Sequence, residues 1–120
     1  MSLVAFGDAR TFSATETAKK MMKELDAKDY FKDIRHMWML GAALGISTGN
    51  TYDEGKRETF ENVNSLDPEG VLGAIMLGLY PDLTPKERVS KLVGHAEWGI
   101  RELHKREKNG TLNFSELAID

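Results

Sequence analysis

Two stretches of the chain are almost continuously apolar. Residues 34–45 read IRHMWMLGAALG, and residues 71–80 read VLGAIMLGLY. Each is too short to cross a membrane as a helix and too uniformly apolar to present a polar side to water. They therefore predict two buried helices around which a small domain is built, with Gly41 and Gly45 where another backbone comes close. The first of the two is predicted to end at Leu44, with Gly45 also serving as the terminating glycine.

Helix-start signals divide the rest of the chain. The capping-box sequence SATE at residues 13–16 predicts that a first helix opens at Ser13. The sequence DPE at 67–69 predicts the start of the second apolar helix, with Asp67 as its N-cap and proline at the first helical position. The sequence TPKE at 84–87 predicts a last and longest helix that runs to about residue 108. These signals predict four main helices.

The longest polar run, STGNTYDEGKRET at residues 47–59, interrupts this helical pattern. A loop of this length in a small domain is either functional or mobile. Residues 59–63 allow a short extended segment, but no sheet is predicted there. The predicted fold is therefore all-α: one domain over residues 1–120, a compact bundle of four main helices with a polar insert at 47–63 and an irregular start at 1–12.

Composition narrows the function classes. Hydrophobic residues are 41% and charged residues 29% of the chain, the net charge is −3, and cysteine is absent. The absence of cysteine excludes disulfides, thiolate catalysis and cysteine-ligated metals, and it fits a cytoplasmic location. The start of the chain has no secretory signal, and no apolar run reaches membrane-spanning length. An acidic balance argues against general attraction to nucleic acid or to an anionic membrane.

A local basic patch is still allowed. Lys56 and Arg57 follow Gly55 in the polar insert, and Arg35 lies near the start of the first apolar helix. Arginine binds phosphate with two parallel hydrogen bonds, and glycine permits close backbone approach. Arg35, Lys56 and Arg57 are therefore a candidate anion or DNA patch. The alternative is that they are solvated charges, and the neighbouring acidic residues would cancel much of their field.

Trp98 is the most unusual residue of the last helix. It points about 180° away from the apolar stripe of that helix, on a side that also carries Lys91 and Arg101. A tryptophan among charges can anchor a partner, so Trp98, Lys91 and Arg101 are a candidate interface. The alternative is that another part of the chain folds over Trp98. A homo-oligomer contact would cover it as well.

Catalytic, cofactor and metal signatures are absent from the sequence. His95 and His104 lie nine residues apart, on opposite sides of one helix, and cannot hold one ion together. Neither a phosphate-binding glycine loop nor a nucleophile with a paired base can be identified. The sequence therefore predicts no catalytic residues, no cofactor and no metal.

Three segments occur in an order that resembles a known family. They are FKDIRHMWMLGAALGIS, then GKR before ETF, then HAEWGIREL in the long helix. The frame over residues 31–117 resembles the small helical proteins called Dnd-system-associated protein four, encoded beside genes for DNA phosphorothioation. The resemblance implies a cytoplasmic accessory protein near DNA modification or restriction machinery, with no established catalytic residues. It draws attention to Gly55, Lys56 and Arg57.

Together these observations predict a non-enzymatic accessory protein that binds a protein partner. The alternative from another class is a nucleic-acid-binding regulator that uses the local basic patch. A small enzyme acting on an anionic substrate at residues 47–59 is the third and least favoured interpretation.

Overall fold

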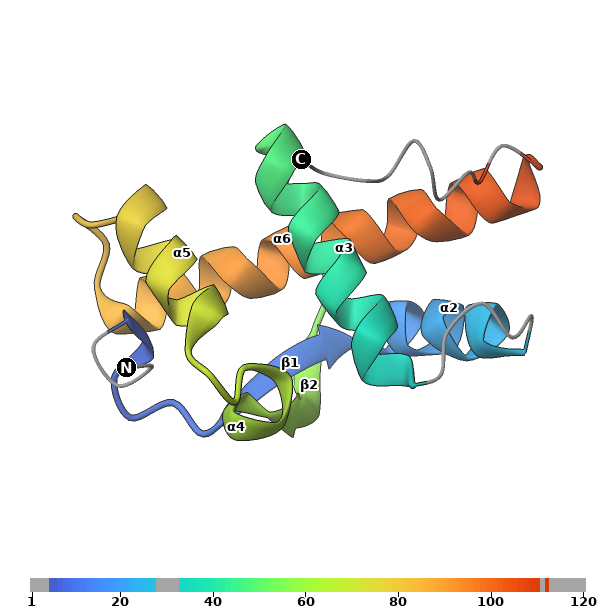
Figure 1. The fold of residues 1–120 in the computed structure, drawn as a ribbon. Helices are drawn as coiled ribbons and strands as arrows, with labels where there is room; N and C mark the ends of the chain where they lie inside the picture. The colour runs from blue at the N-terminus through green and yellow to red at the C-terminus, as the bar shows by residue number, and fades with distance from the viewer. Residues whose placement is uncertain (1–4, 28–32, 111, 113–120) are drawn as a thin grey trace.

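The computed structural model describes residues 5–27, 33–110 and 112. Its elements, in chain order, are β1 (Thr11–Thr15), α2 (Glu16–Asp26), α3 (Ile34–Thr48), β2 (Arg57–Asn62), α4 (Val63–Leu66), α5 (Val71–Leu79) and α6 (Pro85–Lys108). Figure 1 shows α6 running the length of the molecule, with α3 crossing its middle, α5 beside its first half and α2 beside its second half. The predicted all-α bundle is wrong, because β1 and β2 form a two-stranded antiparallel sheet.

The sheet arises where the sequence predicted a helix start and an irregular N-terminus. In β1, Phe12 and Ala14 are fully buried, so the strand turns alternate residues towards the core. Ser13 lies inside the strand, opposite Thr59 of β2. The N-cap of α2 is instead Thr15, whose side chain accepts a hydrogen bond from the amide of Ala18. The helix therefore begins at Glu16, three residues beyond the predicted capping serine.

The second strand lies within the predicted polar insert. An extended segment was expected at 59–63, and the strand occupies Arg57–Asn62. Its register with β1 shifts between Phe12 and Ser13, which marks a bulge. The residue left unpaired at the bulge is Phe60; it packs against the core, and its ring stacks on Trp38 at 6.4 Å between centroids. An apolar partner 22 residues away in the sequence thus fixes a strand whose own residues are largely polar.

Glycines let α3 and α6 touch backbone to backbone. A β-carbon at Gly99 would collide with the carbonyl oxygen of Gly41, and one at Gly45 would collide with the carbonyl oxygen of His95. The predicted close approach at Gly41 and Gly45 is therefore confirmed. The predicted end of the helix is wrong: α3 continues to Thr48, and Gly49 in the left-handed conformation terminates it.

Two buried polar side chains fix both ends of α5. The helix starts at Val71 and not at Asp67, but the buried Asp67 carboxylate still accepts hydrogen bonds from the amides of Leu72 and Gly73, at 3.0 and 2.9 Å. At the other end, the buried Arg88 guanidinium donates to the carbonyls of Tyr80 and Pro81. These contacts anchor both ends of α5 beside the first half of α6.

The predicted boundaries of α6 are confirmed. Thr84 and Glu87 form the reciprocal capping box, Pro85 occupies the first turn, and the helix ends at Lys108. The packing of this helix differs from that of an amphipathic one, because residues of every face are buried along its middle. The central helix of the molecule is therefore α6, which the sequence does not mark as uniformly apolar.

Candidate functional site

The segment between α3 and β2 is pinned across the middle of α6. The amide of Tyr52 donates to the carbonyl of Gly94 at 2.9 Å. A β-carbon at Gly94 would lie 2.6 Å from an Asp53 carboxylate oxygen, so this glycine makes room for the segment. The part of the insert that the sequence marks as functional or mobile is thus closely packed on a helix.

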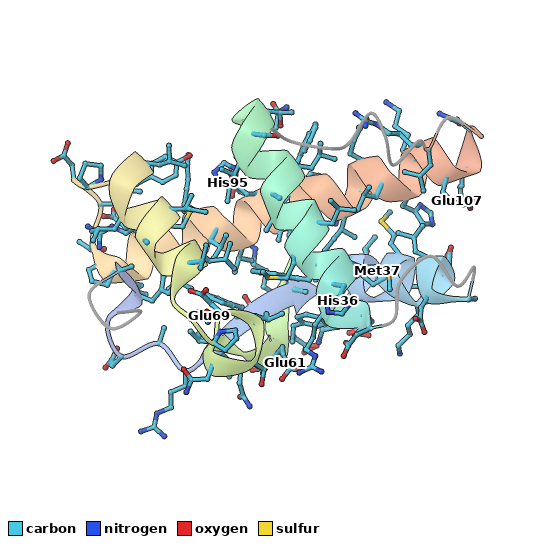
Figure 2. The ribbon with its side chains drawn as sticks, in the orientation of Figure 1. His36, Met37, Glu61, Glu69, His95 and Glu107 are labelled. Atoms are coloured by element: carbon cyan, nitrogen blue, oxygen red, sulfur yellow. The ribbon has the colours of Figure 1, made fainter. Side chains whose placement is uncertain are left out.

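His95 is fully buried and links this segment to the end of α5. Its Nδ1 lies 2.7 Å from the carbonyl oxygen of Asn50, and its Nε2 lies 2.8 Å from the Tyr80 hydroxyl. A carbonyl can only accept, so Nδ1 carries the proton and Nε2 accepts from the hydroxyl. Figure 2 shows His95 on α6, at the crossing with α3. Burial lowers the pKa of His95 below its ordinary value of 6.5, and the charge of Lys91 acts in the same direction.

Glu97 is another buried polar residue of α6, with 1% of its surface exposed. Its two carboxylate oxygens accept hydrogen bonds from the backbone amide and the hydroxyl of Thr15, both at 2.9 Å. Arg101 lies one turn further along α6, with its Nη2 3.4 Å from the same carboxylate. The Glu97 carboxylate therefore ties the junction of β1 and α2 to the central helix.

Arg57 and Arg101 both contact Tyr52, Arg101 at its ring and Arg57 at its backbone carbonyl. The Arg101 guanidinium lies 3.8 Å from the centroid of the Tyr52 ring, and Arg57 donates to the Tyr52 carbonyl at 3.1 Å. Within the described part of the chain, the Nε groups of both arginines are buried without a hydrogen-bond partner. An anion from outside cannot reach these buried groups. Arg101 therefore packs as a cation on the aromatic ring of Tyr52, whereas Arg57 binds the backbone carbonyl of the same residue. Both arginines thus hold the insert through contacts within the chain.

The structure does not assemble the predicted anion patch of Arg35, Lys56 and Arg57. Arg35 pairs with Asp33 at 2.6 Å beside the start of α3, which raises the pKa of Arg35, and the negative charge of Glu61 raises it further. Arg35 is therefore near the Glu61 end of β2, whereas Arg57 is the first residue of that strand. Lys56 is exposed. Arg35 and Arg57 thus lie apart, and each binds acceptors of the chain itself. Arg57 shares a neighbour, Tyr52, with Arg101 instead.

The predicted interface residues are also engaged within the chain. Trp98 is partly buried and packs against the core. Lys91 places its ammonium 5.4 Å from the centre of the Tyr80 ring, and Arg101 covers Tyr52. Lys91 and Arg101 therefore each pack on an aromatic ring of the same chain, and none of the three residues is fully exposed.

Among the described residues, the large apolar side chains that are exposed gather on α5. Val71, Ile75 and Leu79 are 59%, 40% and 52% exposed, and they are spaced four residues apart on one side of the helix. Ala74 and Gly78 are exposed beside them. We call these five residues the α5 face. At about 100° per residue it lies opposite the buried side of the helix, so α5 is apolar on both its inner and its outer side.

This face was missed at the level of sequence because the run at 71–80 predicted a helix buried all round. The signal that could have revealed it is the length of the run: a nine-residue helix packed on one neighbour cannot bury every side. Buried helices with no polar residue need neighbours on all sides, and α5 lies at the edge of the molecule (Figure 1).

A cavity of about 410 Å³ lies between the last turns of α2 and α6. His104 and Glu24 line it, with the imidazole Nε2 2.9 Å from a carboxylate oxygen, and this hydrogen bond lowers the pKa of Glu24. In the described residues no three histidine or acidic side chains come together as a metal site. The same described portion contains no helix of the length and apolarity needed to cross a membrane.

Comparison with known proteins gives no relative: no family model matches the chain, and neither the curated proteins nor the solved structures contain a match. The function of this protein is therefore inferred from the geometry of its described residues.

The buried His95 predicts a loss of stability in mild acid. The unfolded chain binds a proton near pH 6.5, whereas the folded chain resists it, so the free energy of unfolding falls as the pH drops below about 6.5. One proton limits the slope to about 1.4 kcal/mol per pH unit. Urea unfolding between pH 7.5 and 5 measures it. His95→Gln should reduce the dependence of the free energy of unfolding on pH. His36→Gln, at an exposed position, should leave that dependence unchanged. Equal slopes in His95→Gln and the unmodified protein would contradict the prediction.

Proposed function

We propose that this protein is a non-catalytic accessory protein that acts by binding another protein chain, and that the α5 face is its docking surface. The observation that carries the proposal is the exposure of Val71, Ile75 and Leu79 on a helix without a single charged or polar residue. Exposed apolar residues scattered singly are normal, but a contiguous row on one helix is typical of interaction sites.

The anchoring of both ends of α5 supports the same function. The Asp67 carboxylate holds the first amides of the helix, and Arg88 and His95 hold Tyr80 at its end. The face is therefore formed before any partner arrives, and little conformational entropy is lost on binding. Because Arg35 and Arg57 are engaged within the chain, the geometry favours protein binding over the nucleic-acid alternative.

The cellular context is part of the proposal and rests on the sequence alone. The resemblance to Dnd-system-associated proteins would place the partner within a DNA sulfur-modification or restriction system. The absence of cysteine supports a cytoplasmic location.

Site-specific photocrosslinking in cells tests the docking surface. A photoreactive phenylalanine analogue placed at Ile75 should give a covalent adduct with a protein chain, because that position is at the centre of the α5 face. The matched control carries the same analogue at Ser65, an exposed polar position on α4. A second substitution, Val71→Lys, should remove the adduct at position 75. No adduct above the Ser65 control, or one that survives Val71→Lys, would contradict the proposal.

A further inference from the structure

From the α5 face we infer that the partner is a second copy of this chain, packed antiparallel on it through α5. This inference rests on the proposed function, because the second copy would occupy the same surface. One unexplained glycine, the charge of the face and its symmetry select this occupant.

Gly78 is the unexplained residue. In α3 and α6, the glycines at positions 41, 45, 94 and 99 each have a neighbouring atom where a β-carbon would be, and the helices or loops touch there. At Gly78 a β-carbon would meet nothing within 4 Å. Gly78 lies in the last turn of α5, and glycine is a weaker helix former than alanine, so a close contact is one reason for its presence there. No described residue of the same chain provides one, which points to a backbone from outside.

The spacing on the α5 face matches the way this chain already packs helices. Gly41 and Gly45 lie four residues apart and bring α3 onto the backbone of α6. Ala74 and Gly78 have the same spacing on the exposed side of α5, with Val71, Ile75 and Leu79 around them. The surface therefore suits another helix at close approach better than an extended peptide or a flat sheet.

Charge and symmetry select a second copy as that helix. The α5 face carries no charge, although the chain as a whole carries a net charge of −3. Its partner surface must be apolar and uncharged, with small residues at the closest point. An α5 helix from a second molecule meets each of these needs: in an antiparallel pair, Ala74 of each copy faces Gly78 of the other. A two-fold axis makes every such contact twice.

The size of the face sets the strength that we expect. Stable interfaces bury about 800 Å² on each partner, and one side of a nine-residue helix covers only part of that area. The dimer should therefore be weak and should form as concentration rises, without a change in fold.

Sedimentation equilibrium of the purified full chain over about 5 μM to 1 mM tests the inference. The unmodified protein should pass from monomer to dimer. Ile75→Lys should raise the dimer dissociation constant at least about tenfold, because it buries a charge at the centre of the contact. Ser65→Lys adds the same charge at an exposed site outside the face and should leave the constant unchanged.

Gly78→Ala gives a second test, in which a loss of dimer cannot be explained by misfolding. The alanine should raise the melting temperature of the dilute monomer, because it favours the helix, while it weakens the dimer by filling the point of closest approach. A chain that stays monomeric at about 1 mM, or a dimer that Ile75→Lys and Gly78→Ala leave intact, would overturn the inference. If the chain is monomeric but the analogue at position 75 crosslinks to a different protein, the proposed function stands and only the inference fails.

Discussion

Replacing Gly99 with alanine is expected to destabilise the protein by about 3 kcal/mol, at the upper end of the usual cost of overpacking a core. Helix propensity alone predicts the opposite, a gain of about 0.8–1 kcal/mol, because alanine is the better helix former. Packing decides whether the substitution raises or lowers the free energy of unfolding. The added β-carbon would collide with the carbonyl oxygen of Gly41, and both atoms belong to helix backbones that cannot move independently. The helices α3 and α6 would have to separate, which would open the core between them.

Urea unfolding of the dilute monomer measures this effect, and Gly78→Ala is the matched control. Both glycines lie inside helices, but a β-carbon at Gly78 meets nothing within 4 Å. The control should therefore gain stability where Gly99→Ala loses it. Similar changes in the two variants would show that the backbone contact between α3 and α6 does not limit the packing.

Replacing Glu97 with alanine is expected to cost about 3–5 kcal/mol of the free energy of unfolding. The substitution removes the acceptor of two hydrogen bonds from Thr15 and leaves the Thr15 amide buried without a partner. It also removes the countercharge of Arg101 and leaves a cavity in the core. For a domain whose total stability is about 5–15 kcal/mol, this loss would remove a large share of the free energy of unfolding.

Glu102→Ala is the matched control for Glu97→Ala. Glu102 lies on the same helix and forms an ion pair with an arginine four residues later, at 2.8 Å, but its side chain is 21% exposed and that of Glu97 is 1% exposed. Partly exposed pairs contribute about 0–1 kcal/mol. Comparable losses of stability from the two alanine variants would mean that the buried contact with Thr15 contributes little.

A weak dimer would give α5 a use that differs from its role in the fold. Its inner side, with Leu72 and Met76, is buried against the core, and its ends are fixed by Asp67 and by Arg88. The outer side contributes little to the stability of the single chain, because its side chains remain in water. Substitutions on the α5 face should therefore change association without loss of stability, which separates them from substitutions at Gly99 or Glu97.

Local patterns in the sequence determined the boundaries of α6 and the close approach of helices at Gly41 and Gly45. The capping box at Thr84 and Glu87 is made by residues three apart, so the residues that form it are visible in any short window. A glycine pair in an apolar run likewise indicates close contact whatever the partner is. These features depend on neighbours in the chain, and the sequence contains them completely.

Only the tertiary structure decided the sheet, the buried polar residues and the exposed α5 face. The carboxylate of Glu97 binds Thr15, which is 82 residues away, and β1 pairs with a strand more than 40 residues later. Short polar segments such as β2 become strands through a partner, because β-propensity depends on what the strand packs against. The burial of any one side of a helix depends on which elements cover it. The composition of α5 shows that it is apolar, but its place at the edge of the molecule leaves one apolar side in water.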